Sequence, residues 1–323
     1  DKQKRVLCII QEEAGKLIVL DHHVSALRRF EAEPGLADGL RYRGHVIAGT
    51  HDIAWLDPRY AKERHPGDPW DIAARAIPNV RYVAVSEERA RQLAELTGMA
   101  RRRITVVPNG IDLRARLGLS IAGGRLAQRL GLLEAEPLLL LPARLTRRKR
   151  IEVAIDALHA LRERHPRATL VITGTPGPHN VANAAYAAEL ADRARQGAGV
   201  HLLHALGIRV TDGVLADLFA LADAMVLPSE SEGFGIPMLE AGAHGVPVVC
   251  SDLPTLRAVA GDAATYVDPA ADGRTFATAV ERRLAADPVA RLRRRAKQHA
   301  WPRILREQVV PTILSDLRGD DAQ

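Results

Sequence analysis

The stretch that decides the fold is Ser231-Glu232-Gly233-Phe234-Gly235-Ile236-Pro237-Met238-Leu239-Glu240-Ala241-Gly242. An apolar run typical of a strand precedes it at 224–227, and a second one follows it at 246–250. A strand, a glycine turn that frees backbone N–H groups and a helix N-terminus together make a site for anions. A carboxylate beside such a site adds an acceptor for hydroxyl groups. The stretch therefore predicts a ligand with both phosphates and hydroxyls, and that combination indicates a nucleotide-sugar.

The rest of the chain alternates strand and helix patterns, which is typical of α/β proteins with parallel sheets. The helix predicted at 87–96 has Ser86 as its N-cap and Gly98 beyond its end. The predicted strands lie at 6–10, 17–20, 45–48, 82–85, 104–107, 138–141, 168–173, 200–203, 224–227 and 246–250. The other predicted helices lie at 151–165, 184–196, 213–222, 237–243, 273–287 and 288–316, and a short helical connector is predicted at 117–133. This order predicts two nucleotide-binding halves and a C-terminal helix, with ligands outside the carboxyl ends of the strands.

The composition leaves room for more than one domain. The chain has 323 residues, of which 47% are hydrophobic, and it can fill one large core or two ordinary ones. We expect two. No apolar run approaches the roughly 18 residues that a membrane span needs, and no signal peptide is visible. We therefore expect a cytoplasmic protein.

The net charge of +6 permits an anionic partner without identifying one. Nucleic acid is the weaker interpretation, because an Arg-rich nucleic-acid-binding module predicts binding that falls steeply with salt and ignores free UDP or GDP. Cys8 and Cys250 each end an apolar strand pattern and are expected to be small buried hydrophobes. Since no CxxC spacing occurs, we expect neither a metal site nor a redox site built on thiols. We also expect no cofactor, because the nucleotide-sugar would be a substrate.

A basic loop follows the strand predicted at 138–141. Residues 142–150 read Pro-Ala-Arg-Leu-Thr-Arg-Arg-Lys-Arg, and a predicted helix begins directly after them. Cations beside helix N–H groups suit a diphosphate. Lys149 is the only Lys between Lys62 and Lys297. On spacing alone, a solvated basic loop is an equally good interpretation.

Two carboxylates, Glu232 and Glu240, lie on either side of the glycine turn. Glu240 is about one turn inside the predicted helix, from where it could accept two hydroxyls of a ribose or simply face solvent. Glu232 could hold a ligand hydroxyl or cap the helix. Each structural interpretation is favoured when a carboxylate is considered alone. Taken together, with Gly233 and Gly235 between them, the two carboxylates favour a ligand site.

The stretch from Glu232 to Glu240 resembles the E-x7-E signature of the retaining family 4 glycosyltransferases, which have GT-B architecture. Arg144 and Lys149 resemble the diphosphate-binding R-x4-K element of that family. Residues 222–229 resemble its approach strand, and residues 83–86 and 107–112 resemble the markers at the end of its first domain. The resemblance covers most of residues 45 to 270.

The resemblance implies an α/β fold of GT-B type, with two Rossmann-like domains facing a cleft. Residues 1–116 would be a truncated N-terminal acceptor-side domain, 117–298 the nucleotide-sugar-binding domain, and 299–323 a C-terminal helix returning to the first domain. The implied reaction moves a hexosyl-type sugar from a nucleoside-diphosphate sugar to an acceptor hydroxyl. The resemblance further implies retention of anomeric configuration and no metal. A saccharide, a lipid-linked or a small-molecule acceptor all remain open.

The resemblance also implies roles for individual residues. Arg144 and Lys149 would neutralise the donor diphosphate as it leaves. Glu232 and the amides of the glycine turn would hold the sugar, and Glu240 would hold the ribose. His51 would face the transferred sugar, with a structural loop histidine as the alternative. The expected catalytic residues are Glu232, His51, Arg144 and Lys149, and the expected donor-binding residues are Gly233, Phe234, Gly235, Ile236, Glu240 and Gly174.

The chain departs from the family pattern in places. No Gly-Gly turn follows a first strand, and the segment before His51 is short, so we expect the start of the first domain to be missing. Arg150 stands where Gly is common in the family. The main alternative function is a non-catalytic nucleotide-sugar-binding or partner subunit with a degenerate first domain. A GT-B epimerase would lack the E-x7-E signature, and a phosphorylase would need a pyridoxal lysine. The basic run at 291–297 is expected to be a solvated helix face or, alternatively, a contact with anionic lipid at the inner membrane face.

Overall fold

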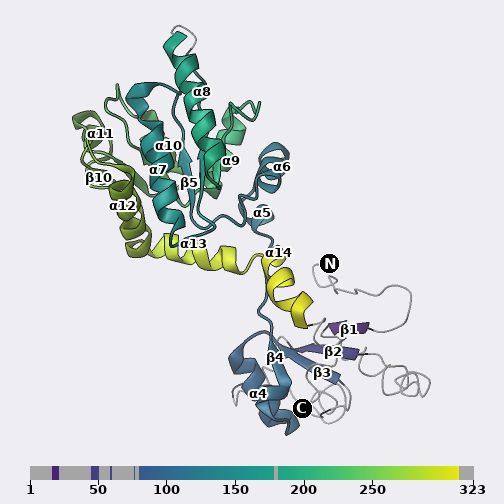
Figure 1. The fold of residues 1–323 in the computed structure, drawn as a ribbon. Helices are drawn as coiled ribbons and strands as arrows, with labels where there is room; N and C mark the ends of the chain where they lie inside the picture. Colours follow the sequence, from purple (N-terminus) through teal and green to yellow (C-terminus); the bar gives the residue numbers. More distant parts are fainter. Residues whose placement is uncertain are drawn as a thin grey trace. The chain divides into compact units, whose positions relative to one another are not determined.

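The computed structural model describes residues 17–21, 45–50, 59, 76, 80–177 and 181–312. His51 and the strand predicted at 6–10 lie outside the described residues. The chain divides into two compact units, one of Asp1–Gly110 with Trp301–Gln323 and one of Ile111–Ala300 (Figure 1). The domain limits expected from the sequence, after 116 and after 298, stay predictions.

The first unit holds a parallel sheet in the order β1-β2-β3-β4. Its strands are β1 (Leu17–Asp21), β2 (His45–Thr50), β3 (Val80–Ala84) and β4 (Ile104–Val106). Helix α4 (Glu87–Thr97) begins where the Ser86 Oγ accepts a hydrogen bond from the Arg89 amide at 3.2 Å, and it ends at Gly98, whose φ is 71°. Both caps of this helix are therefore as the sequence predicts. Helix α14 (Trp301–Ile304) and a π-helical turn (Leu305–Val309) belong to the same unit.

The second unit is built on a six-stranded parallel sheet in the order β10-β9-β8-β5-β6-β7. Its strands are β5 (Leu138–Leu141), β6 (Thr169–Ile172), β7 (Val200–Leu202), β8 (Ala224–Leu227), β9 (Val248–Ser251) and β10 (Thr265–Val267). The chain runs outward from β5 to β7 and then returns to β8 on the other side of β5. The order of the strands therefore reverses between β5 and β8, and ligands of parallel sheets bind outside the strand ends at such a point.

Helices connect these strands and cover the sheet (Figure 1). They are α5 (Leu113–Arg116), α6 (Ile121–Arg129), α7 (Ile151–Arg162), α8 (Val181–Gln196), α9 (Asp212–Leu221), α10 (Ile236–Ala243), α11 (Pro254–Ala260), α12 (Gly273–Ala286) and α13 (Pro288–Gln298). The four leucines of β5 are all buried in the core, each worth about 1.5–3 kcal/mol of transfer free energy. Gly273 lets α12 approach α7 closely, because a Cβ there would lie 2.6 Å from the Ala157 nitrogen.

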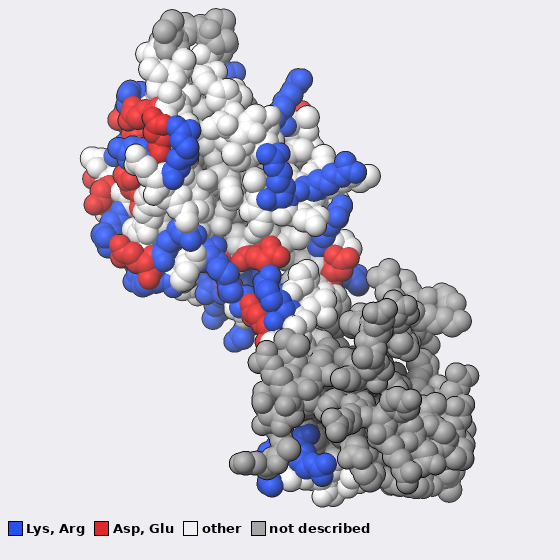
Figure 2. All heavy atoms as spheres, turned by 45° about the vertical axis from the view of Figure 1, so that its right-hand side comes forward, with Lys and Arg blue, Asp and Glu red and all other residues white. Residues whose placement is uncertain are grey.

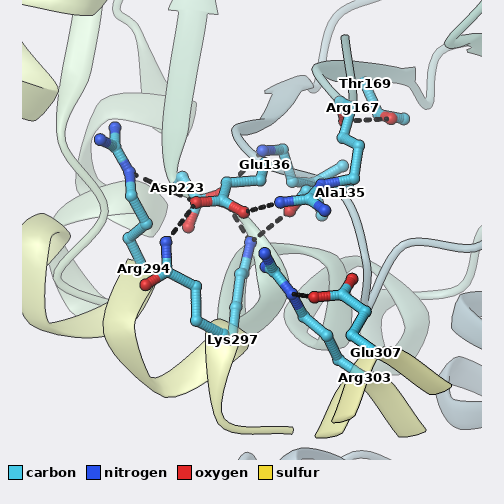
Figure 3. Close-up of polar contacts among 11 residues, drawn as sticks. Ala135, Glu136, Arg167, Thr169, Asp223, Arg294, Lys297, Arg303 and Glu307 are labelled. Atoms are coloured by element: carbon cyan, nitrogen blue, oxygen red, sulfur yellow. Dashed lines mark hydrogen bonds and ion pairs between the residues drawn. The ribbon is translucent and has the colours of Figure 1, made fainter. Parts of the chain in front are cut away.

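A buried ion pair ties α13 to the sheet (Figure 3). The Lys297 Nζ lies 2.6 Å from Asp223 Oδ2 and donates to the Ala135 carbonyl at 3.2 Å. The same carboxylate oxygen accepts from the Leu138 amide, at the start of β5, at 2.7 Å. Asp223 thus joins a helix near the end of the unit to the first strand of its sheet. Removal of either charge would leave the other one buried without its partner.

The structure differs from the predicted elements in two places. The helix predicted at 288–316 is interrupted, because α13 ends at Gln298 and α14 begins at Trp301. Pro302 has no N–H to donate back to the preceding turn, and it is tolerated only at the start of a helix. The short elements α11 and β10 were not predicted. Among the helices of the described residues, none has both the length and the apolar character that a membrane span requires.

Candidate functional site

The centre of the candidate site is an ion pair between Lys149 and Glu232. Lys149 follows β5 and Glu232 follows β8, so the pair lies at the point where the strand order reverses. The Lys149 Nζ donates to Glu232 Oε1, and only 11% and 8% of the two side chains are exposed. Lys149 is therefore not part of a solvated loop. Two residues expected to be catalytic lie in direct contact.

Further contacts join the same two loops. The Glu230 amide donates to the Arg148 carbonyl at 2.8 Å, and Arg148 Nη1 donates to the Ser231 carbonyl at 3.0 Å. The backbones on both sides of the ion pair are thereby held in register. These contacts place Lys149 and Glu232 opposite each other.

Ser229 is a third member of this group. Its hydroxyl donates to Glu232 Oε1 at 2.8 Å, the oxygen that also accepts from Lys149. Glu232 does not cap α10, whose N-cap is Gly235 and has no side-chain hydrogen bond. The interpretation of Glu232 as a helix cap is therefore wrong. Ser229 was recognised in the sequence as part of the approach strand, but no role was assigned to it.

The turn after Glu232 offers backbone donors. Gly235 adopts φ 97°, which favours glycine, and it begins α10. Within the described residues, the amides of Gly233, Phe234 and Gly235 donate to no other group. The Phe234 and Ile236 side chains are exposed. A helix start with unpaired amides beside a carboxylate can bind anionic and hydroxyl groups, as the sequence predicts.

Glu240 lies within α10, in its second turn. Its side chain is half-buried, and in the described part of the chain its carboxylate has no hydrogen bond or ion pair. Both its oxygens are thus available to a ligand. The assignment to a ribose stays a prediction, as does the role of His51.

The basic loop is shaped by Arg150, whose φ of 46° is the only positive value of a non-glycine residue in the described chain. Its guanidinium donates to the carbonyls of Pro269 and Ala271. The first amide of α7, that of Ile151, donates to the Tyr186 hydroxyl at 3.0 Å. The Ile151 amide is therefore already paired, and the expected diphosphate site at the start of this helix stays a prediction.

Tyr186 was not identified from the sequence as a capping residue. It is fully buried, and its hydroxyl donates to the Glu152 carboxylate while accepting from Ile151. Burial, followed by the hydrogen bond to Glu152, raises the pKa of Tyr186. Tyr186 therefore fixes the start of α7. Its signal in the sequence is only a single aromatic residue in a helix rich in alanine.

A pocket of about 630 Å³ opens at the carboxyl ends of β5, β6 and β7. Arg144 and Gly174 both line it, with apolar side chains from Ile208, Val210 and Leu215. Gly174 is required there, because a Cβ would lie 1.7 Å from the Ala143 carbonyl oxygen. The remaining lining residues are Pro142, Ala143, Thr173, Thr175, His204, Gly207 and Arg209. The pocket combines apolar walls with a cation, as a nucleoside phosphate requires.

Within the described residues, His, Cys, Asp and Glu side chains form no group of three or more that could hold a metal ion. Cys250, at the end region of β9, is fully buried and unpaired with another cysteine. Burial raises the pKa of its thiol to about 12. Cys250 is therefore a small buried hydrophobe, as the sequence predicts.

Known proteins resemble this chain over both units. The D-inositol 3-phosphate glycosyltransferase of Nocardia farcinica is 36% identical over 196 residues, which are 57% of this chain and 40% of that protein. The glycogen synthase of Mycobacterium tuberculosis is 31% identical over 247 residues, which are 76% of this chain and 54% of that protein. The chain spans about half the length of the curated relatives it matches. The crystal structure of Alr3699/HepE from Anabaena with UDP and glucose matches with a TM-score of 0.43 and 18% identity, over 93% of this chain and 78% of that one.

Two family models match the sequence. Residues 26–115 match the model described as glycosyltransferase family 4, and residues 125–300 match the model described as glycosyl transferases group 1. The α/β class of GT-B type, with Rossmann-like parallel sheets, is confirmed. The match to residues 125–300 covers more than half of this chain and contains the whole Lys149–Glu232 site. The chain therefore belongs to the glycosyl transferases group 1 family.

Proposed function

We propose that this protein is a retaining glycosyltransferase that uses a nucleoside-diphosphate sugar and needs no metal. The observation that carries the proposal is the Lys149–Glu232–Ser229 group at the strand-order reversal, beside a turn with unpaired amides. Family membership supports the reaction class. Alr3699/HepE from Anabaena has been solved in complex with UDP and in complex with UDP-glucose.

In the proposed reaction, the bond between the anomeric carbon and the phosphate oxygen breaks while the acceptor oxygen bonds to the same face of that carbon. The acceptor proton passes to the departing phosphate oxygen. The protein then needs no nucleophile, and its task is to stabilise the charge that develops on the diphosphate. Arg144 and Lys149 would supply that positive charge. A Lys ammonium has three N–H donors, so Lys149 can retain Glu232 and still donate to phosphate.

The donor would lie along the carboxyl ends of β5 to β8. The pocket lined by Arg144 and Gly174 would accept the nucleoside. Glu240 would accept the ribose hydroxyls, while Glu232 Oε2 and the amides of Gly233, Phe234 and Gly235 would hold the sugar. His51 would contact the transferred sugar, as the resemblance implies. The assignment explains why Glu232 and Glu240 both keep carboxylate oxygens without partners in the described residues.

The test is a calorimetric screen with UDP, GDP, ADP and dTDP at low and high salt. We expect saturable binding of one diphosphate that persists at high salt, because the site recognises more than charge. Lys149→Ala should weaken that binding at least about tenfold, as expected when a charge-assisted hydrogen bond is lost. Release of the diphosphate from the matching sugar nucleotide would then establish turnover.

Arg147→Ala is the matched control for one lost positive charge in the same loop. Arg147 is exposed and pairs with Glu189 at 2.7 Å, away from Glu232. It should leave the affinity within about twofold. Binding without turnover would favour the non-catalytic nucleotide-sugar-binding subunit. Binding that disappears with salt and does not depend on the nucleoside would favour a nucleic-acid partner. Figure 2 shows Lys and Arg interspersed with Asp and Glu on the face of the second unit that it presents, which does not favour that partner.

We also propose a peripheral contact with an anionic membrane, at the cytoplasmic face, through α13. Val289 and Leu292 are 59% and 71% exposed, and Arg291 and Arg295 are exposed on the same helix. Apolar and cationic side chains together favour the surface of an anionic bilayer. Leu292→Ser should reduce co-sedimentation with phosphatidylglycerol vesicles. Equal sedimentation of the wild type and Leu292→Ser would indicate that the basic run of α13 is a solvated helix face.

A further inference from the structure

The most informative unassigned residue in the site is Ser229. It lies directly after Pro228, which follows β8, and none of its surface is exposed. Its hydroxyl donates to Glu232 Oε1 at 2.8 Å. In the described chain this buried hydroxyl has no second side chain to bond with. Its direction is therefore set by Glu232.

The two oxygens of Glu232 have different surroundings. Oε1 accepts from both Ser229 and Lys149. Oε2 bonds to no described residue, and it retains some exposed surface although the side chain as a whole is only 8% exposed. One oxygen is thus anchored to the protein, and the other is available to a ligand hydroxyl.

Neither the glycines that follow Glu232 nor Lys149 fixes the position of its carboxylate relative to the sheet. Gly233 and Gly235 follow it, and glycine restricts the backbone least. Lys149 reaches Glu232 through four methylene groups, a longer connection to the backbone than the single methylene of a serine. Ser229, by contrast, lies two residues after a strand whose four residues are all buried. The hydroxyl of Ser229 therefore relates the Glu232 carboxylate to the rigid sheet.

We propose that Ser229 is a positioning residue that keeps Glu232 oriented when Lys149 turns to the donor diphosphate. The inference rests on the proposed function. A diphosphate shares the Lys149 ammonium with Glu232, and each bond that Lys149 gives to phosphate weakens its hold on Oε1. Ser229 then maintains Oε1 in place, so that Oε2 still meets the sugar. Ser229 acts through Glu232 and does not touch the donor itself.

The test compares Ser229→Ala with Ser251→Ala. Ser251 is an equally buried serine at the end of the adjacent strand β9, and its hydroxyl has no partner in the described structure. Ser229→Ala should lower kcat for diphosphate release from the sugar nucleotide about 10- to 100-fold, the range for a lost hydrogen bond to a charged group. The Kd of the free nucleoside diphosphate should change less than about threefold. Ser251→Ala should change neither, and Ser229→Thr, which keeps the hydroxyl, should recover part of kcat.

A second measurement does not depend on turnover. The chain has only six lysines, so the rate of Lys149 acetylation by acetic anhydride can be followed by mass spectrometry, with the other lysines as reference. Ser229→Ala should accelerate the acetylation of Lys149, because a loosened Glu232 shields it less. In a Glu232→Ala background, Ser229→Ala should have no further effect on either kcat or acetylation.

The outcomes separate this inference from the function on which it rests. If the wild-type chain neither binds a nucleoside diphosphate nor releases one, the proposed function fails and the inference fails with it. If the wild type does both, and Ser229→Ala matches Ser251→Ala, only the inference is overturned. Effects of Ser229→Ala that add to those of Glu232→Ala would also overturn it, since Ser229 would then act independently of Glu232.

Discussion

Arg150 has a left-handed backbone conformation, with φ 46° and ψ 48°, that side chains other than glycine rarely adopt. This conformation directs the chain from the Lys149 turn into α7. Its guanidinium binds two carbonyls beyond β10, at Pro269 and Ala271. The contacts of the side chain offset the strain of the backbone. This balance explains how Arg can stand where glycine is common in the family.

Two substitutions separate these opposing effects. Arg150→Gly and Arg150→Ala both remove the carbonyl contacts, so both should lower the free energy of unfolding below that of the wild type. Only alanine keeps the left-handed strain of about 1–2 kcal/mol, while glycine pays about 0.5–1 kcal/mol in chain entropy. We expect Arg150→Ala to be less stable than Arg150→Gly by about 0.5–1 kcal/mol in urea unfolding. The reverse order would show that the backbone there is unstrained.

At this scale, the sequence identifies the residues of the site but not their contacts. The resemblance points to Lys149 and Glu232 separately, as groups for phosphate and for sugar. Their ion pair joins positions 83 residues apart, and it depends on β5 lying next to β8. Local patterns do not contain that adjacency. Ser229 was missed for the same reason, because a buried serine after a strand is recognisable only when its acceptor is known.

The turn between β8 and α10 is the element on which the donor site depends. Gly235 has φ 97°, and a Cβ on it would lie 2.7 Å from Leu256 Cδ2. Gly233 has no positive φ, and a Cβ there would meet nothing within 4 Å. The two glycines, two residues apart in one turn, therefore differ in both backbone conformation and available space.

Gly235→Ala should consequently destabilise the protein by about 1–2 kcal/mol, the cost of a left-handed alanine. It should also weaken binding of the sugar nucleotide, since the amides of the turn that would hold its sugar would be displaced. Gly233→Ala is the matched control and should change the free energy of unfolding by less than about 0.5 kcal/mol. Urea unfolding and calorimetry of both variants check this. If Gly235→Ala changes stability and binding as little as Gly233→Ala does, the turn tolerates a side chain at both positions.

Most elements of the second unit could be predicted because apolar strands alternate with helices between glycine and proline residues. The strand predicted at 138–141 coincides with β5, and that predicted at 224–227 coincides with β8. Elements that were missed are short. The three residues of β10 and the seven of α11 contain too few positions for a period to emerge. The order of the strands came only from the structure.

At the scale of the whole molecule, the second unit begins and ends at one place. Ile111 and Ala300 form an isolated parallel bridge, and the Ile111 amide donates to the His299 carbonyl at 2.7 Å. All six strands of its sheet lie between these two residues. A continuous segment with adjacent ends and its own core has the properties of an independently folding domain.

We therefore expect residues 111–300 to fold alone, with a cooperative unfolding transition. Every expected donor-binding residue lies within this segment, so its affinity for the nucleoside diphosphate should stay within about threefold of that of the whole chain. Diphosphate release from the sugar nucleotide should be lost, because His51 and the rest of the first unit are absent. A folded segment that does not bind would show that the donor site needs the first unit as well.

Residues 111–286 provide the control for this experiment. This shorter segment keeps the sheet and the Lys149–Glu232 pair but lacks α13, and with it Lys297. Asp223 would then be a buried charge without its counter-ion, which costs about 3–5 kcal/mol and approaches the whole stability of many domains. We expect the shorter segment to lose its cooperative transition in circular dichroism while the longer one keeps it. If the two segments unfold with the same cooperative transition, α13 is not needed to stabilise the sheet, and the domain ends before α13.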